Sequence, residues 1–375
     1  MQNPESILVT GACGFVGSTL IHELSEQMPN VNLYGIDNLS RKGSQQNAPA
    51  LKAAGCQLTI GDIRNPQHLS KIPKVDWVID CAANPSVLAG VDGISSSFDL
   101  MDHNLVGTIQ ILEFCKQHQA GFILISTNRV YSISELSRMR LKELNGAYYP
   151  EFEPAAFDLG GSGMIGTKRT VIRQKPLTTE GVTEVFSTAP PLSLYGMSKL
   201  CSEGIAMEYG STFGFPVWIN RCGVLAGAGQ FGKPDQGIFS YWIHSWAKRR
   251  PLKYIGFSGE GFQVRDCLHP KDLMPLLNRQ MRESKRNINR IINVAGGVKN
   301  AMSLRQLSDW CTHRFGPHQV SCDRNPRPFD IPWMVLDSSM AKELWNWEPF
   351  TPIANILEEI AQHAEENPHW LDTTS

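Results

Sequence analysis

Short apolar runs recur along the first 220 residues, and segments whose apolar positions have helical spacing lie between them. The first run, Ser6–Thr10, ends in glycine-rich sequence and is typical of a buried parallel strand. Further strands are expected at residues 31–37, 57–60, 77–81, 122–126 and 216–221, and helices at 15–26, 104–117 and 194–213. Strands that alternate with helices predict an α/β fold, namely a Rossmann doubly wound parallel sheet.

The alternating pattern breaks after Tyr131. Residues 132–190 carry mixed charge and several glycines, and they end at Pro190-Pro191. A structureless stretch of this length is uncommon inside a compact domain, so we expect 132–190 to be a lid or a substrate-contacting insertion. Beyond Gly223 the chain is richer in glycine, proline and aromatic residues, with surface helices expected at 303–314 and 355–366. We therefore expect a first domain over 1–222, and a smaller C-terminal α/β substrate-binding portion over 223–375 that can interleave with it.

Composition excludes several classes of protein. The 375 residues are 42% hydrophobic and 19% charged with a net charge of −1, so no surface for nucleic acid or an anionic membrane is expected. No apolar stretch approaches the roughly 20 residues that span a bilayer, and no targeting segment is expected. The nine cysteines include no Cys-x-x-Cys pair, and the histidines show no ligand spacing. We expect free thiols in a reducing cytoplasm and no metal site.

A glycine motif joins the first strand to the first helix. Gly11-Ala12-Cys13-Gly14-Phe15-Val16-Gly17 fits G-x-x-G-x-x-G, in which the glycines let the backbone turn tightly and approach a pyrophosphate. Asp37 lies 20 residues further, at the end of the second expected strand, where a carboxylate accepts hydrogen bonds from ribose hydroxyls. An acid there repels the 2′-phosphate of NADP. The pattern favours NAD, although Arg41 and Lys42 follow closely and weaken the argument against NADP.

A second motif, Tyr195-Gly196-Met197-Ser198-Lys199, places a tyrosine and a lysine on one face of an expected helix. A free tyrosine has a pKa of about 10, and a nearby ammonium together with the positive nicotinamide ring lowers that pKa. Tyr195 could then exchange a proton with a substrate hydroxyl. Tyr-x-x-x-Lys also occurs by chance on amphipathic helices. Thr127, at the end of a central strand where ligands bind in such sheets, could position the same oxygen.

These three motifs in this order resemble the extended short-chain dehydrogenase/reductase superfamily, the NAD-dependent epimerases and dehydratases of nucleotide sugars. The resemblance covers nearly the whole chain. Within the superfamily the chain is most similar to the group of CDP-paratose (CDP-tyvelose) 2-epimerases, on the segments 37–43, 61–65, 126–131, 230–231, 235–237 and 263–266. The resemblance implies NAD as cofactor, a nucleotide-sugar substrate, and a cytoplasmic homodimer or homotetramer.

The resemblance also implies roles for individual residues. Thr127, Tyr195 and Lys199 match the catalytic residues. Cofactor contacts are matched by Gly11, Gly14, Phe15, Val16, Gly17, Asp37, Asn38, Ser40, Asp62, Ile63, Ala82, Ala83, Asn104, Tyr195 and Lys199. Substrate contacts are matched by Asn128, Gln230, Gln236, Arg265, Arg327 and Asp330. Arg265 matches an arginine that grips the substrate diphosphate, a task that suits a planar guanidinium. The long gap from Tyr131 to Tyr195 departs from the family.

The residues around Thr127 and Tyr195 bear on four alternatives to a CDP-sugar 2-epimerase. A 4,6-dehydratase needs an Asp-Glu pair directly after the catalytic threonine, and here Asn128 and Arg129 cannot transfer protons. A decarboxylase of UDP-glucuronate would need an acid at position 129. A UDP-sugar 4-epimerase uses the same threonine, tyrosine and lysine and remains the main alternative to a CDP-sugar 2-epimerase. A non-catalytic NAD-binding Rossmann protein would have no need of Tyr195 and Lys199.

Overall fold

The central element of the computed structural model is a seven-stranded sheet. The structure describes residues 3–93, 95–151, 164–165, 172–173, 175–283 and 288–374. The strand order is β16–β12–β5–β4–β1–β2–β3, and every pairing is parallel. The strands are β1 (Ser6–Thr10), β2 (Asn32–Asp37), β3 (Gln57–Ile60), β4 (Trp77–Asp80), β5 (Gly121–Thr127), β12 (Val217–Cys222) and β16 (Ile291–Val294). The order reverses beside β1, which confirms the predicted doubly wound sheet.

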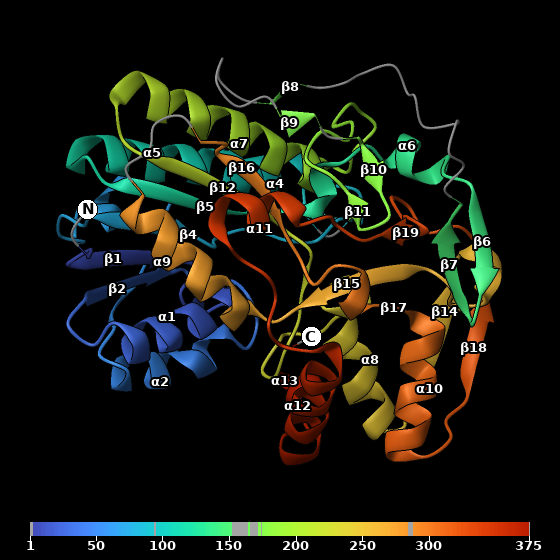
Figure 1. Cartoon of the computed structure of the whole chain (residues 1–375). Coiled ribbons are helices and arrows are strands. Elements are labelled where there is room, and N and C mark those ends of the chain that lie inside the picture. Colours follow the sequence, from blue (N-terminus) through green and yellow to red (C-terminus); the bar gives the residue numbers. More distant parts are fainter. Residues whose placement is uncertain are drawn as a thin grey trace.

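Helices cover both faces of this sheet (Figure 1). They are α1 (Phe15–Gln27), α2 (Ala48–Ala53), α3 (Pro66–Leu69), α4 (Ser97–Met101), α5 (Gly107–His118), α7 (Leu194–Phe213), α9 (Met274–Arg282) and α11 (Ser339–Trp345). Successive side chains of β1 point to opposite faces of the sheet and so belong to two separate cores. Ile7 and Val9 pack with Leu20 of α1 on one face. Leu8 packs with Ile111 of α5 on the other face. The sheet is therefore buried on both sides.

The second half of the chain builds a smaller layer beside the sheet (Figure 1). It contains β13 (Val224–Leu225), β14 (Leu252–Ile255), β15 (Val264–Leu268), β17 (Ala301–Ser303), β18 (Val320–Asp323), β19 (Trp333–Met334), α8 (Ile238–Ala247), α10 (Leu304–Phe315), α12 (Ile353–Glu366) and α13 (Trp370–Thr374). Its core includes Trp242, Trp246 and Leu357. Strand β16 returns to the main sheet beside β12, so the two parts of the chain interleave.

The segment after Tyr131 has more regular structure than its sequence suggested. It contains α6 (Ile133–Ser137), β6 (Leu141–Leu144), β7 (Ala147–Pro150), β8 (Met164–Ile165), β9 (Ile172–Arg173), β10 (Leu177–Thr178) and β11 (Gly181–Val182). Strands β6 and β7 form a hairpin whose turn is Asn145-Gly146, with φ of 50° and 72°. Asn-Gly favours this turn because both residues tolerate positive φ. The described part of this segment is therefore not structureless, and its role as a lid or substrate-contacting insertion stays a prediction; residues 152–163, 166–171 and 174 lie outside the described part.

Three expectations from composition can be compared with the fold. All nine cysteines are free thiols, and most are buried. In the part of the chain that the structure describes, no helix is long and apolar enough to cross a membrane. Among the same residues no group of three or more His, Cys, Asp or Glu side chains gathers in an arrangement that could hold a metal ion.

Candidate active site

A cavity of about 650 Å³ opens at the carboxyl ends of β1, β2, β4 and β5. Fourteen of the fifteen predicted cofactor residues line it: Gly11, Gly14, Phe15, Val16, Gly17, Asp37, Asn38, Ser40, Asp62, Ile63, Ala82, Ala83, Tyr195 and Lys199. We call it the cofactor cavity. Gly11 has a φ of +59°, and a Cβ there would lie 3.0 Å from the backbone of Ala82. Only glycine therefore fits this turn comfortably.

Asp37 is held rigidly at the end of β2. Its Oδ2 accepts a hydrogen bond from the backbone N–H of Cys13 at 2.9 Å, and its Oδ1 accepts one from Leu39 at 2.7 Å. Burial raises the pKa of Asp37, and these backbone hydrogen bonds oppose the rise. Each carboxylate oxygen keeps a further lone pair, so Asp37 can still accept from ribose hydroxyls in the cavity.

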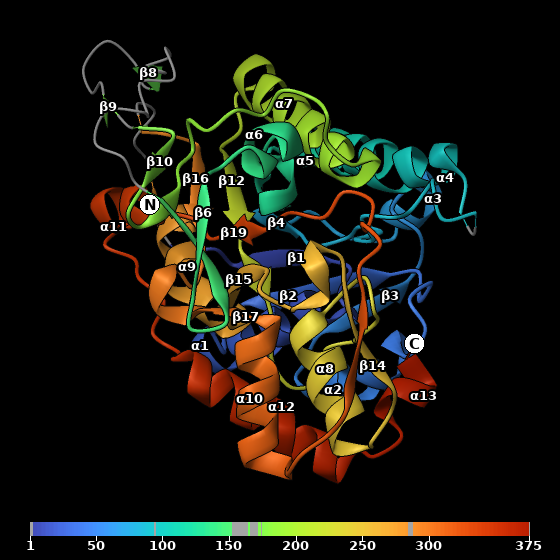
Figure 2. The same ribbon diagram turned by 90° about the vertical axis from the view of Figure 1, so that its right-hand side faces the viewer.

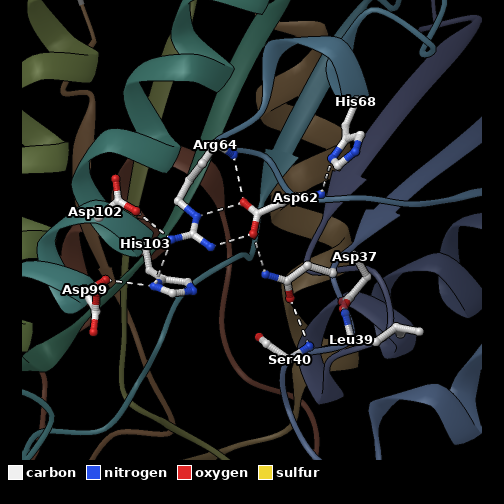
Figure 3. A network of polar contacts seen from close by, with 10 residues as sticks. Asp37, Leu39, Ser40, Asp62, Arg64, His68, Asp99, Asp102 and His103 are labelled. Atoms are coloured by element: carbon white, nitrogen blue, oxygen red, sulfur yellow. Dashed lines mark hydrogen bonds and ion pairs between the residues drawn. The ribbon is translucent and has the colours of Figure 1, made fainter. Parts of the chain in front are cut away.

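A charged network forms the wall beside Asp37 (Figure 3). Arg64 donates to Asp62 at 2.7 Å and to Asp102 at 2.5 Å, and the Asn38 side chain donates to Asp62 at 3.0 Å. The Arg64 guanidinium holds the pKa of the Asp62 carboxyl well below its usual range. Asp62 therefore remains an anionic acceptor of fixed orientation on the cavity wall. The sequence indicated Asp62 and Asn38 but not Arg64 or Asp102, whose contact joins residues 38 positions apart.

The three predicted catalytic residues come together in the cofactor cavity. Thr127 ends β5, while Tyr195 and Lys199 lie in the first turns of α7. Helix α7 begins at a cap in which the Ser193 hydroxyl accepts from the backbone N–H of Gly196 at 3.0 Å. Because Gly196 has no side chain, the carbonyl group of Arg129 approaches the helix closely, which brings the end of β5 against Tyr195.

The pKa values of Tyr195 and Lys199 are shifted by different neighbours. Burial raises the pKa of Tyr195, and hydrogen bonding with Thr127 and the positive charge of Arg129 oppose the rise. Burial lowers the pKa of Lys199, and the buried carboxyl of Asp80 opposes that fall. In the chain without cofactor, the positive charge that opposes the rise in the Tyr195 pKa is that of Arg129. The charge of Lys199 opposes the rise in the pKa of the buried Asp80 carboxyl, and its expected effect on Tyr195 stays a prediction.

A second cavity of about 390 Å³ adjoins the first, since Gln236 and Gly237 line both. We call it the substrate cavity. Arg129, Arg265 and Arg327 line it together with Asp330. Arg265 pairs with Asp330 at 2.9 Å, and Arg129 donates to the Phe329 carbonyl at 3.2 Å. Burial and the neighbouring Arg265 lower the pKa of Arg129 to about 10. The lining thus carries an excess of positive charge and suits a diphosphate.

Three predicted residues lie elsewhere than expected. Asn104 is buried outside the cofactor cavity, where its Oδ1 accepts from the backbone N–H of Asn84 at 2.7 Å and its amide donates to the Asn84 carbonyl at 3.1 Å. It shapes the cavity through Asn84, which does line it. Asn128 is buried and lines neither cavity, and Gln230 borders the cofactor cavity.

Sequence reasoning missed two arginines of the site. Arg129 lines the substrate cavity, and its place two residues after Thr127 was a usable signal. Arg41 lines the cofactor cavity, where it binds Gln236, 195 positions away. A contact over that separation leaves no trace in local sequence pattern.

The fold and the cofactor cavity define a class of protein. A family model described as "NAD dependent epimerase/dehydratase family" matches residues 7–151 and 159–295, and the chain belongs to that family. The glycine turn and the fixed carboxylate of Asp37 suit a dinucleotide, and NAD is the cofactor.

Individual relatives are more distant. The chain is 26% identical to CDP-paratose 2-epimerase of Salmonella typhi, over 81% of this chain and 84% of the relative. It is 26% identical to UDP-glucuronate 4-epimerase of Thermodesulfobacterium geofontis, over 96% of each chain. Among solved structures, UDP-glucuronic acid 4-epimerase of Bacillus cereus, in complex with UDP-glucuronic acid and NAD, has a TM-score of 0.73. That match covers 96% of this chain and 99% of the other at 24% identity, and it shows the shared fold.

Proposed function

We propose that this protein is a nucleotide-sugar epimerase that inverts one sugar carbon through a transient keto intermediate. The observation that carries the proposal is the meeting of Thr127, Tyr195 and Lys199 in the cofactor cavity, directly beside a cavity lined by three arginines. The residues after Thr127 are Asn128 and Arg129, which supply no carboxyl group for the elimination of water. This arrangement supports inversion over dehydration.

The two cavities suggest how the substrate lies. A diphosphate bound by Arg265 and Arg327 would direct the sugar past Arg129 toward Tyr195. In this proposal residues 223–375 supply most of the nucleotide site. Tyr195 takes the proton from one ring hydroxyl, and the Thr127 hydroxyl donates a hydrogen bond to the same oxygen. NAD, when bound, supplies the hydrogen acceptor for that carbon. The keto-sugar then turns over in the cavity and would receive the same hydrogen back from the reduced cofactor on its other face, and Tyr195 returns the proton.

The substrate we favour is a CDP-linked deoxy sugar inverted at C2. The support is the match of the runs 126–131 and 235–237 to the CDP-paratose 2-epimerases, together with the identity to the Salmonella enzyme. The alternative is inversion at C4 of a UDP-linked sugar, which has the same demands on Thr127 and Tyr195. Its support is the equal identity to a UDP-glucuronate 4-epimerase.

A substrate panel distinguishes these possibilities. Purified protein is incubated with CDP-, UDP-, GDP- and dTDP-linked sugars, and the products are followed by proton NMR. We expect interconversion of two epimers with no net formation of NADH, and the CDP-linked sugar as the best substrate. Tyr195→Phe should lower kcat by roughly 100-fold or more, the usual contribution of a placed acid/base. Loss of water from the sugar would contradict the proposal.

A further inference from the structure

Residues 230–237, between β13 and α8, lie over the cofactor cavity, and we call them the roof segment. Gln230, Phe231 and Lys233 line the cofactor cavity, whereas Gln236 and Gly237 border both cavities. The position of this segment therefore affects both the enclosure of the cofactor and the junction with the substrate. The segment is held in place by contacts with Arg41, Ser86 and Trp370.

From the sheet side, Arg41 binds the roof segment directly. Its guanidinium donates to the Phe231 carbonyl at 2.5 Å and to the Gln236 side chain at 3.1 Å, and it lies 5.9 Å from the centre of the Phe231 ring. Burial lowers the pKa of Arg41, and the carboxylate of Asp235 opposes this. A third contact comes from Ser86, which donates to Asp235 at 2.6 Å.

From the outer side, Trp370 of α13 binds the same segment. Its indole N–H donates to the Gln230 carbonyl at 3.0 Å, and its ring stacks on Phe231 with centroids 5.7 Å apart and an interplanar angle of 16°. Phe231 thus contacts both Arg41 and Trp370. Trp370 itself lines neither cavity, so any influence on the cofactor passes through Gln230 and Phe231.

Helix α13 is itself fastened to both parts of the molecule. The Asp372 carboxylate pairs with Arg250, after α8, at 2.5 Å, and the Asp372 carbonyl accepts from Lys42, in the loop after β2, at 3.3 Å. His363 of α12 packs edge-on against Trp370 at 4.7 Å. Figure 2 shows α13 at the right-hand edge of the molecule, outside the central sheet. The helix is therefore placed to fix the roof segment relative to the sheet.

We propose that α13, through Trp370, holds the roof segment closed over NAD, and that Trp370 is a positioning residue for cofactor retention. This goes beyond the proposed reaction, since it concerns the cofactor and holds whichever sugar is the substrate. If the roof segment closes only part of the time, the apparent dissociation constant of NAD rises in inverse proportion to the closed fraction. Removing the stacked ring and the indole hydrogen bond together lowers that fraction.

The test compares three variants by NAD titration and by the rate of NAD dissociation. Trp370→Ala should weaken NAD binding by about tenfold and speed dissociation correspondingly, with a larger effect on the NAD concentration that gives half-maximal activity than on kcat at saturating NAD. Trp370→Phe keeps the stack on Phe231 and should recover most of the affinity. The matched control is Trp310→Ala on α10, a partly buried tryptophan that packs against Phe315 and lines neither cavity. Unchanged affinity in Trp370→Ala, or an equal loss in Trp310→Ala, would overturn the proposal.

A double-variant experiment keeps the test independent of folding defects. Arg41→Met and Trp370→Ala each remove contacts with Phe231 and with the backbone of the same segment, so their combined effect on NAD affinity should be smaller than the product of the single effects. Circular dichroism confirms that each variant is folded before titration. Fully multiplicative effects would show that the two residues act separately, and the shared role of the roof segment would be wrong.

Discussion

Tyr195 is surrounded by groups that shift its pKa in opposite directions. Burial raises the pKa of the phenol, whereas Thr127 and the guanidinium of Arg129 favour the phenolate. Arg129 is held by its donation to the Phe329 carbonyl and by its place at the junction of β5 with α7. In the reaction that we propose, the charge of Arg129 therefore favours the phenolate of Tyr195, at a position where a UDP-glucuronate decarboxylase would carry an acid.

Replacement of Arg129 should change the pH dependence of the reaction. In Arg129→Gln the charge that lowers the Tyr195 pKa is lost, so that pKa rises and the acidic limb of kcat/KM moves to higher pH. Arg327→Gln is the matched control, because Arg327 lines the same cavity, whereas the positive charge that opposes the rise in the Tyr195 pKa is that of Arg129. The acidic limb of kcat/KM for Arg327→Gln should stay at its original pH. An acidic limb that does not move in Arg129→Gln would show that Arg129 does not lower the Tyr195 pKa.

Arg265 should affect the substrate and not the cofactor. Arg265 lines the substrate cavity and pairs with Asp330. Charge-assisted hydrogen bonds from its guanidinium to a bound diphosphate would contribute about 1.5–3 kcal/mol to the binding free energy. Arg265→Ala should raise the KM for the nucleotide sugar by roughly 10- to 100-fold, while NAD affinity stays at its original level. Arg265→Lys should restore only part of the loss, since an ammonium cannot form two parallel bonds. Steady-state kinetics measure the KM for the nucleotide sugar, and an NAD titration measures the cofactor affinity. An unchanged KM in Arg265→Ala would exclude Arg265 from the substrate site.

At the scale of elements, the packing of α1 on the glycine turn determines the shape of the pyrophosphate site. A Cβ on Gly17 would meet the carbonyl group of Gly11 and lie 3.0 Å from the Cα of Ala12. Gly17→Ala should therefore push α1 away from β1, lower the free energy of unfolding by about 1–3 kcal/mol and weaken NAD binding.

Gly204→Ala in α7 provides the matched control for this change. A Cβ on Gly204 meets no atom within 4 Å, so the substitution should be neutral or stabilising. Thermal denaturation with and without NAD measures both variants. Equal stability of the two would show that the close approach of α1 to the turn is unimportant.

The elements differ in how well local pattern predicts them. The helix at 194–213 agrees with α7, because a serine cap marks its first turn and Gly214 marks its end. The helix expected at 104–117 agrees less well. A π-helical turn over Asp102–Val106 joins α4 to α5, and the buried Asn104 in that turn binds the backbone of Asn84. Such a turn is held by tertiary contacts and has no periodic signature.

Strand β16 shows the limit of prediction from local pattern. Residues 291–294 form the edge of the main sheet beside β12, although about 70 residues of the smaller layer separate the two strands in sequence. The apolar run Ile291–Val294 is compatible with a strand, but its partner follows only from the path of the whole chain. The cofactor residues near the motifs were predictable because their turn, strand end and helix are local features. The contacts of Arg41 and Trp370 were not.

At the scale of the whole molecule, exposed apolar side chains lie on α4, on the π-helical turn that follows it and at the end of α7. Phe98 is 75% exposed, Val106 38% and Phe213 36%. Helices α4 and α5 both pack against α7, and exposed apolar side chains on neighbouring elements can be buried by association. We predict a homodimer through these helices, with α5 and α7 at the interface.

Light scattering at micromolar protein measures this assembly. The expected mass is twice that of the chain, and Phe98→Asp should shift the protein toward monomer, since a charge at the interface would lose its water. Leu144→Asp changes another exposed apolar residue, 50% exposed on the β6–β7 hairpin, and should leave the assembly intact. A monomeric parent protein would contradict the prediction.

The most direct test of the central claim follows the hydrogen on the carbon that inverts. A substrate carrying deuterium on that carbon is turned over many times, and the product is examined by mass spectrometry and NMR. If Tyr195 moves only the hydroxyl proton, and the carbon-bound hydrogen stays within the closed cavities, the deuterium remains on the same carbon after inversion. Washout of the deuterium into water would instead indicate deprotonation beside a carbonyl group, and it would contradict the account.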